Sequence, residues 1–270
     1  MTSRERIGPG KTGRKGIYIL PNLFTSASLF GGFYALIAAV QARYETAAVA
    51  IIISAVFDAL DGRIARFTHT SSRFGTEYDS LADLISFGVA PAILSFLWAL
   101  KGFGRLGWLA AFMYVICGAL RLARFNVEKN SIRTRYFKGL PIPAAACFIA
   151  SLVLFSGAIH GFAENRETMI IGMIYVLSFL MVSSLHYFDF KEIHLKNQKP
   201  FNVLVAIILV FIFIAYKPKV LLFFILLSYI LSGPAVTLLR FYRNRAEAPD
   251  SISVISQESM EKRDMDGLNE

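Results

Sequence analysis

The stretch of sequence that decides the fold runs from Phe57 to Pro91 and reads FDALDGRIARFTHTSSRFGTEYDSLADLISFGVAP. It contains four aspartates, at positions 58, 61, 79 and 83, and the sequence on either side is apolar enough for a lipid bilayer. A charged side chain at the centre of a membrane helix costs about 2.5 kcal/mol or more. The four carboxylates therefore need a partner that compensates their charge.

The spacing of the aspartates indicates what that partner is. Residues of an α-helix advance by about 100°, so two predicted helices each carry two aspartates and small residues on one face. On the first helix this face holds Asp58, Asp61, Gly62 and Ala65, and on the second it holds Gly75, Asp79 and Asp83. Such a set of oxygen ligands, with room beside it, suits a hard divalent cation such as Mg²⁺, Mn²⁺ or Ca²⁺.

The composition of the whole chain is that of a membrane protein. The chain has 270 residues, of which 55% are hydrophobic, and its mean hydropathy is +0.53. Both cysteines, Cys117 and Cys147, lie in apolar blocks, which predicts neither a disulfide framework nor a cysteine zinc site. The net charge is +9, but the basic residues flank apolar blocks. This placement favours contact with anionic lipid headgroups and argues against a nucleic-acid partner.

Apolar blocks of membrane-spanning length predict an all-α, polytopic bundle of about eight transmembrane helices. The predicted spans are 21–40, 46–67, 77–99, 107–125, 141–160, 167–186, 201–216 and 219–241. One transmembrane domain is expected over residues 17–245. A mobile basic tail is expected over residues 1–16, and a disordered polar tail over residues 246–270.

The distribution of Lys and Arg predicts the orientation of the bundle. With the N-terminus inside, 22 of these residues lie on the cytoplasmic side and 6 on the other side. This bias places both termini in the cytoplasm. The second span then ends, and the third begins, on the cytoplasmic side, so all four aspartates fall at one level. We expect an integral protein of a bacterial-type cytoplasmic (inner) membrane with its active site facing the cytoplasm.

The spacing D-x2-D-G-x2-A-R-x8-G-x3-D-x3-D, from Asp58 to Asp83, resembles the motif of the CDP-alcohol phosphotransferase family at every fixed position. Members of that family are integral membrane enzymes that use a hydroxyl acceptor and divalent metal to displace CMP from a CDP-linked lipid or alcohol. The resemblance implies two bound ions, Mg²⁺ or Mn²⁺, with Ca²⁺ as a further candidate. It implies that Asp58, Asp61 and Asp79 ligate metal, and that Asp83 both helps to bind metal and acts as the base.

The same resemblance implies a nucleotide site. Its residues would be Gly62, Ala65, Arg66 and Gly75, together with Asn22 and Thr25 on the first predicted span. Small side chains let the nucleotide approach the helix backbone, and a guanidinium fork matches phosphate. Asn22 and Thr25 have an alternative role in capping or packing helices. For the aspartates the alternative is a buried ion-pair network with Arg63 and Arg66, but four acids exceed two bases in an apolar setting.

Four further strings narrow the resemblance to one subfamily, the membrane-embedded phosphatidylserine synthases. They are LPNLFT at 20–25, SLADLISFGVAPA at 80–92, RLARFN at 121–126 and GLPIPAAA at 139–146. The implied substrates are CDP-diacylglycerol and L-serine, and the implied assembly is a homodimer among membrane lipids. The resemblance fades over the last three predicted spans.

Candidate substrate contacts lie near the aspartates in the predicted topology. Arg121 and Arg124, one turn apart at the inner end of the fourth predicted span, are positioned for the lipid pyrophosphate or the serine carboxylate. Ser86, close after Asp83, is a candidate for shaping the acceptor pocket, and Lys138 is a further basic candidate. Ordinary positive-inside flanking is the alternative for the basic residues.

Two other functions compete with serine transfer. The first keeps the reaction class and uses another acceptor, namely glycerol-3-phosphate, an inositol phosphate or choline. A basic cluster over residues 121–138 would serve a phosphorylated acceptor, and only the strings around SFGVAP and GLPIPAAA speak against it. The second is a cation transporter with the aspartates as its ion site. Transporter sites lie near the midplane between repeats, whereas these acids cluster toward one side and the sequence shows no repeat.

Overall fold

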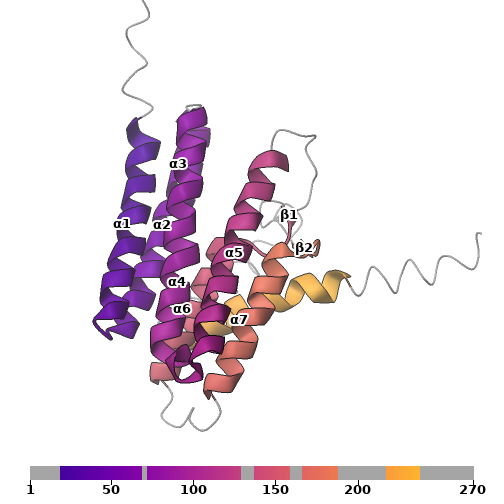
Figure 1. The fold of residues 1–270 in the computed structure, drawn as a ribbon. Coiled ribbons are helices and arrows are strands. Elements are labelled where there is room, and N and C mark those ends of the chain that lie inside the picture. Colours follow the sequence, from indigo (N-terminus) through magenta and orange to yellow (C-terminus); the bar gives the residue numbers. More distant parts are fainter. Residues whose placement is uncertain (1–18, 69–71, 129–136, 159–165, 188–216, 238–270) are drawn as a thin grey trace, which may run out of the picture.

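The structure is a computed structural model, and it describes residues 19–68, 72–128, 137–158, 166–187 and 217–237. The predicted tails over 1–16 and 246–270 and the predicted seventh span over 201–216 lie outside the described residues. The described part of the chain is a helical bundle (Figure 1). The prediction of a helical fold is therefore confirmed, and the number of spans and their orientation stay predictions.

The first half of the bundle contains the two aspartate-bearing helices. Helix α1 (Ile19–Val40) is followed after a short turn by α2 (Tyr44–Thr68), and these two helices pack along each other. Ser72 begins α3 (Arg73–Asp83), since its side chain accepts a hydrogen bond from the amide of Gly75 at 2.9 Å. Such an N-cap satisfies one of the free amides of the first turn.

Helix α3 continues without a break as one helical segment from Arg73 to Phe103, but its hydrogen-bond pattern changes along the way. The segment passes through a π-helix η1 (Leu84–Val89), α4 (Ala90–Ser95), a second π-helix η2 (Phe96–Leu100) and a 3₁₀ turn η3 (Lys101–Phe103). π-Helical turns are rare and occur frequently at functional sites. Here the first one starts directly after Asp83.

Buried polar contacts hold the first π-helix in place. The hydroxyl of Tyr114 donates to the carbonyl of Phe87 at 3.2 Å, and the hydroxyl of Ser86 donates to the carbonyl of Ser28 at 3.1 Å. Gly32 on α1 allows this approach, because a Cβ there would lie 2.5 Å from the Cα of Ser86. The backbone that follows Asp83 is therefore packed directly against α1.

The second half of the bundle is formed by α5 (Arg105–Glu128), α6 (Ile142–Ala158) and α7 (Arg166–Val182). The predicted span over 167–186 is too long, since α7 ends at Val182 and the two-residue strand β2 (His186–Tyr187) follows. This strand pairs antiparallel with β1 (Phe137–Lys138). Next to the pair, the amide of Gly139 donates a hydrogen bond of 2.8 Å to the carbonyl of Leu185. No strand was predicted, because two residues are too few to form a periodic pattern.

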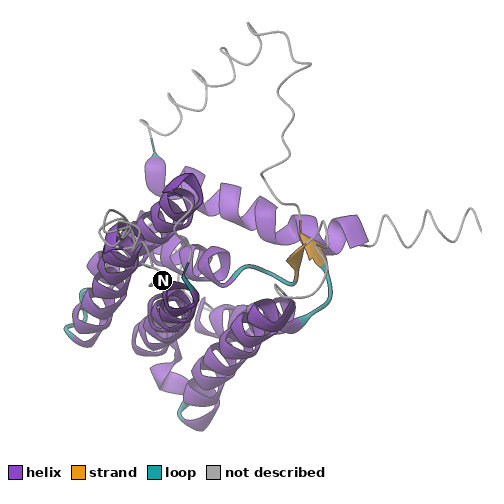
Figure 2. Cartoon of the chain, turned by 90° about the horizontal axis from the view of Figure 1, so that it is seen from above, coloured by secondary structure: helices purple, strands orange, loops and turns teal. Residues whose placement is uncertain are grey.

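A final helix, Pro218–Thr237, runs across the other helices rather than along them (Figures 1 and 2). Phe223 stacks on Phe155 with ring centroids 4.5 Å apart, which attaches this helix to α6. Its first turn is attached to α2 by an ion pair of 2.7 Å between Lys219 and Glu45. The predicted span over 219–241 thus corresponds to a helix with a direction that the sequence did not predict.

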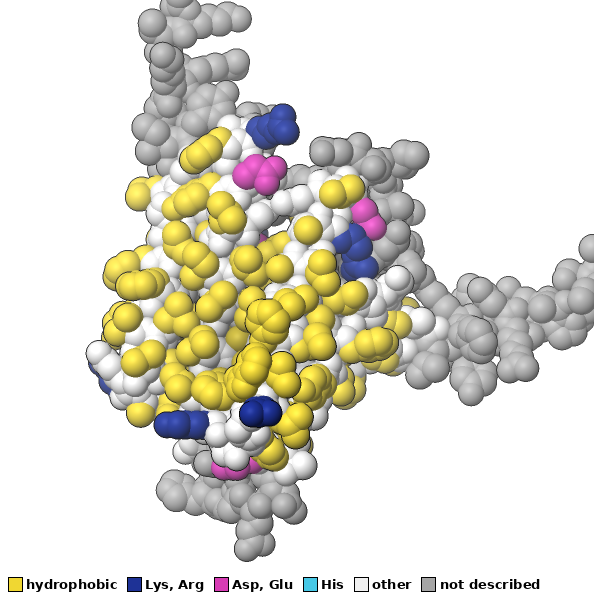
Figure 3. All heavy atoms as spheres, viewed as in Figure 1, with side chains coloured by type: hydrophobic (Ala, Val, Ile, Leu, Met, Phe, Trp, Pro, Cys, Tyr) yellow, Lys and Arg dark blue, Asp and Glu magenta, His cyan; other side chains and the backbone are white. Residues whose placement is uncertain are grey.

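The lengths and surfaces of the helices agree with a membrane environment. Helices long and apolar enough to cross a bilayer in the described part of the chain are Asn22–Val40, Arg73–Phe103, Arg105–Glu128 and Pro218–Thr237. Helices over 142–158 and 167–182 are apolar but shorter. On the face shown in Figure 3, apolar side chains cover the middle and charged side chains gather toward the two ends. A surface of this kind matches an apolar bilayer core between polar interfaces.

Candidate metal and substrate site

Three of the four aspartates meet at one point between α2 and α3. Asp58, Asp61 and Asp79 each offer a carboxylate oxygen within 4.8 Å of the others. Asp58 and Asp61 come from the second half of α2, and Asp79 comes from α3. Close carboxylates repel each other unless a cation or proton lies between them. The packing of these two helices therefore creates a site that favours positive charge.

The fourth aspartate, Asp83, adjoins this group from one turn further along α3. Its carboxyl group lies next to that of Asp58. Asp83 is not a member of the group of three found among the described residues. It lies instead at the junction of α3 and the first π-helix. The four carboxylates thus form one continuous cluster, in which three lie close together and Asp83 lies at its edge, at the end of α3.

Asp61 is the most enclosed of the three grouped carboxylates. The residue is 5% exposed, and one of its carboxylate oxygens accepts a hydrogen bond of 2.8 Å from the hydroxyl of Thr25 on α1. Thr25 is itself buried. In this structure Thr25 therefore orients a carboxylate of the site, and the nucleotide contact that the family resemblance implies for it stays a prediction.

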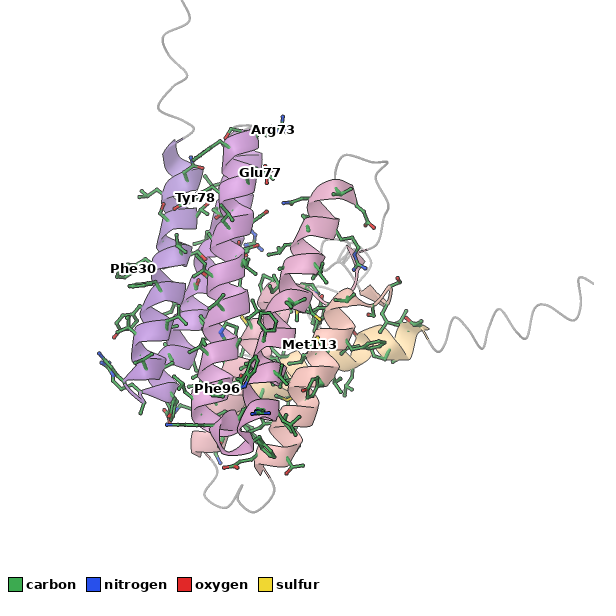
Figure 4. The ribbon with its side chains drawn as sticks, in the orientation of Figure 1. Phe30, Arg73, Glu77, Tyr78, Phe96 and Met113 are labelled. Carbon is green, nitrogen blue, oxygen red and sulfur yellow. The ribbon has the colours of Figure 1, made fainter. Side chains whose placement is uncertain are left out.

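Asn22 and Gly75 lie beside each other where α1 meets the first turn of α3. A Cβ added at Gly75 would be 3.2 Å from the side-chain oxygen of Asn22 and 3.1 Å from the hydroxyl of Ser72. Gly75 therefore permits the close approach of α1 to α3. Also between α1 and α3, the hydroxyl oxygens of Ser26 and Tyr78 are 2.9 Å apart. Figure 4 shows Tyr78 near Glu77 and Arg73, at the end of α3 where that helix begins.

The remaining predicted nucleotide residues lie in the last turns of α2. Gly62 is exposed, and a Cβ built on it would have no atom within 4 Å. This open space next to Asp61 leaves the helix backbone accessible to a ligand. Ala65 and Arg66 follow on the same helix, and their side chains lie outside the described part of the structure.

The two arginines of α5, Arg121 and Arg124, have different surroundings in the structure. Arg124 donates to the carbonyls of Val182 and Ser183, at 2.9 and 3.4 Å, and so holds the C-terminal end of α7. Arg121 is 8% exposed, and its Nε atom has no hydrogen-bond partner among the described residues. Its guanidinium is attracted electrostatically by Asp83. A buried cation with a free donor beside the carboxylates is positioned to receive an anionic group.

The other predicted substrate residues have different surroundings. Ser86 is fully buried and bonded to the backbone of α1, which leaves it a packing role in this structure. Lys138 lies in β1, and its side chain is outside the described part. The sequence did not single out Tyr229 of the last helix, which lies near Arg121. The family resemblance fades in that region, so no sequence signal connected this tyrosine with the site.

The residues present fit a divalent cation. The group of three supplies only carboxylate oxygens, which are the ligands that Mg²⁺ and Mn²⁺ prefer. The hydroxyl of Thr25 orients one of these carboxylates, that of Asp61, by donating a hydrogen bond to it. Metal ligands are commonly oriented in this way by neighbouring side chains. Asp58, Asp61 and Asp79 would therefore hold the ion, with Asp83 adjoining it through Asp58.

Comparison with known proteins identifies the family of this chain. The family model described as CDP-alcohol phosphatidyltransferase matches residues 18–185, which include α1 to α7 and all four aspartates. The last helix, Pro218–Thr237, lies beyond the matched region.

Three curated proteins illustrate the similarity. A CDP-diacylglycerol–serine O-phosphatidyltransferase of Helicobacter pylori (strain J99) is 40% identical over 196 residues, covering 73% of this chain and 83% of that protein. A protein of the same name from Bacillus subtilis is 35% identical over 178 residues, covering 66% and 94%. An archaetidylserine synthase of Methanothermobacter thermautotrophicus is 36% identical over 170 residues, covering 62% and 69%.

Proposed function

Because the chain belongs to the CDP-alcohol phosphatidyltransferase family, we propose that it transfers the phosphatidyl group of CDP-diacylglycerol to the hydroxyl of L-serine. The products are phosphatidylserine and CMP. The observation that carries the proposal is the convergence of Asp58, Asp61 and Asp79 within 4.8 Å in a chain of this family. The names of the related proteins support serine as the acceptor.

The chemistry needs charge neutralisation and an activated hydroxyl. A pair of divalent ions, Mg²⁺ or Mn²⁺, held by the carboxylates would offset the charge of the pyrophosphate and of departing CMP. The serine oxygen attacks the phosphorus that carries the diacylglycerol, and the bond from that phosphorus to the CMP oxygen breaks. Asp83 takes the proton of the serine hydroxyl as the new phosphorus–oxygen bond forms. The steps balance without any covalent intermediate on the protein.

The experiment that tests the acceptor measures CMP released by the purified protein from CDP-diacylglycerol. L-Serine, glycerol-3-phosphate, an inositol phosphate and choline are compared at equal concentration with Mg²⁺ or Mn²⁺ present. We expect CMP release with L-serine to exceed release with each other acceptor by about 10²-fold. The reason is that a site built to bind the polar groups of serine leaves its own polar groups unpaired when another acceptor binds. Faster release with a phosphorylated acceptor would replace serine in the proposal.

We assign Arg121 to the serine carboxylate, because the Nε atom of this buried guanidinium has no hydrogen-bond partner among the described residues and the group lies near Asp83, the proposed base. A hydrogen bond to a charged group contributes about 1.5–3 kcal/mol. Arg121→Lys should therefore raise the KM for serine about tenfold or more and leave the KM for CDP-diacylglycerol within about twofold. Steady-state kinetics with each substrate varied in turn measures both constants.

Arg124→Lys is the matched control for this prediction, because Arg124 bonds to the carbonyls that end α7. It should lower thermal stability and leave the KM for serine unchanged. If Arg121→Lys instead raises the KM for CDP-diacylglycerol alone, Arg121 binds the lipid pyrophosphate and the assignment is wrong.

The proposed orientation has eight spans with both termini and the active site on the cytoplasmic side of a bacterial-type inner membrane. It is supported by the 22 Lys and Arg residues on that side against 6 on the other. The resemblance to the family also supports a homodimer. The eight-span orientation includes residues outside the described part of the structure, and the homodimer involves a second copy of the chain.

Cysteine labelling tests the orientation in a variant in which Cys117 and Cys147 are replaced by alanine. Thr70→Cys and Asn130→Cys should react with a membrane-impermeant maleimide only after the inner membrane is opened. Glu164→Cys should react in intact spheroplasts. The reverse pattern would move the carboxylates to the outer side and contradict the proposed topology.

A further inference from the structure

The carbonyl of Phe87, in the first π-helix, lacks its usual α-helical donor because of Pro91. In an α-helix the amide four residues further along would bond to this carbonyl, but proline has no amide hydrogen and its ring crowds that carbonyl. The hydroxyl of Tyr114 on α5 donates to the carbonyl instead, at 3.2 Å. Phe87 and Tyr114 are both fully buried, so this bond is shielded from solvent. A single side-chain hydroxyl thus stabilises the backbone of the π-helix.

The π-helix determines which way Asp83 faces relative to the buried segment that follows it. A π-turn contains one residue more than an α-turn, and each residue of a helix adds a rotation of about 100°. The helix after the turn, α4, is held in the core by buried residues that include Ala90, Ala92 and Leu94. If the π-turn became α-helical while α4 stayed in place, the carboxyl of Asp83 would therefore rotate away from its position next to Asp58.

Two hydrogen bonds connect α5 to this segment, one on each side of Asp83 (Figure 1). Before Asp83, the side-chain amide of Asn126 donates to the hydroxyl of Ser80 at 2.9 Å. After Asp83, Tyr114 bonds to the π-helix. Arg121, which is two helical turns from Tyr114, lies near Asp83 between these two bonds. A groove of about 240 Å³ separates α3 from α5 over part of this stretch, so the two bonds rather than close packing set the spacing of the helices there.

We propose that Tyr114 is a positioning residue for Asp83, because its hydroxyl holds the π-turn that directs the Asp83 carboxyl toward the substrate. The inference rests on the proposed function, in which Asp83 takes the proton of the serine hydroxyl. A general base must lie within hydrogen-bond reach of the proton that it removes. A small rotation of the helix therefore lowers the rate without removing any group that binds substrate. Tyr114 acts through the backbone of the π-helix and is not itself a catalytic residue.

The second π-helix provides a matched control for this proposal. The hydroxyl of Tyr44 on α2 donates to the carbonyl of Leu97 in that π-helix at 3.1 Å. Leu97 lies beyond α4, several turns from Asp83. Tyr44→Phe and Tyr114→Phe therefore each remove one tyrosine hydroxyl from a π-helical carbonyl and keep the aromatic ring, but only Tyr114→Phe acts on the turn next to Asp83.

Kinetics of the two variants test the proposal. Tyr114→Phe should lower kcat for serine-dependent CMP release about tenfold and leave the KM values for serine and CDP-diacylglycerol within about twofold, because the binding groups stay in place. Combined with Asp83→Asn, Tyr114→Phe should lower the remaining rate less than about twofold, since no base is left to misplace. Tyr44→Phe should leave kcat within about twofold. An unchanged kcat in Tyr114→Phe, or an equal fractional loss with and without Asp83, would overturn the proposal.

Amide hydrogen exchange, measured by mass spectrometry, tests the effect on the π-turn without turnover. Tyr114→Phe should speed exchange about threefold or more over residues 84–90, and Tyr44→Phe should do so only over residues 96–103. Unchanged exchange over residues 84–90 in Tyr114→Phe would contradict the proposal. If exchange there rises but the unmodified protein releases no CMP with serine, the acceptor in the proposed function is wrong, and the kinetic comparison is made with the acceptor that supports release.

Discussion

Asp61→Asn is expected to lower serine-dependent CMP release by about 10³-fold, since it removes a charge from the group of carboxylates that would hold metal. Asparagine has nearly the same shape and can still accept the hydrogen bond from Thr25, so α1 and α2 should pack as before. Asp58→Asn and Asp79→Asn should have effects of similar size. Activity is measured as CMP release, and Mn²⁺ binding is measured separately by electron paramagnetic resonance.

Metal removal should reproduce the loss in the unmodified protein. EDTA should abolish turnover, and Mg²⁺ or Mn²⁺ should restore it. Glu167→Gln is the matched control, because it removes an exposed carboxylate on α7, outside the group of three, and should retain full activity and Mn²⁺ binding. Full turnover in EDTA, or in any of the three aspartate variants, would remove metal from the proposed mechanism.

Asp83→Asn is expected to lower kcat by about 10²-fold or more, the usual effect of losing a general base. A serine hydroxyl is a weak nucleophile at neutral pH and needs a proton acceptor when it attacks. Asp83 lies next to Asp58 and near Arg121, and it is outside the group of three. Its replacement should therefore affect kcat more than the binding of CDP-diacylglycerol or of Mn²⁺.

Isotope exchange tests whether serine attacks directly. Labelled CMP should not enter CDP-diacylglycerol when serine is absent, because direct displacement leaves no phosphatidyl group on the protein to react with CMP. The measurement is made with unmodified protein, and the labelled lipid is counted after extraction. Rapid exchange without serine would demonstrate a covalent intermediate and would require a nucleophile in place of a base.

Much of the candidate site was predictable because its spacing is local. Asp58 and Asp61 share a face of one helix whatever surrounds it, and the same holds for Asp79 and Asp83. The roles of Thr25 and Arg124 were not predictable in this way. Each depends on a partner distant in sequence, Asp61 for the first and the end of α7 for the second. The spacing of residues along one helix contains no information about which other helix a side chain contacts.

The sequence by itself determined the helical class, the approximate extent of the helices and the pairing of two carboxylates on each of two faces. These features follow from hydrophobic length and helical period, which are properties of single segments. Only the tertiary structure decided that the last helix runs across the bundle and that a groove separates α3 from α5. It also decided that the Nε atom of Arg121, near Asp83, has no hydrogen-bond partner in the described part of the chain. The physical reason is that direction, burial and open space arise from the packing of several helices at once.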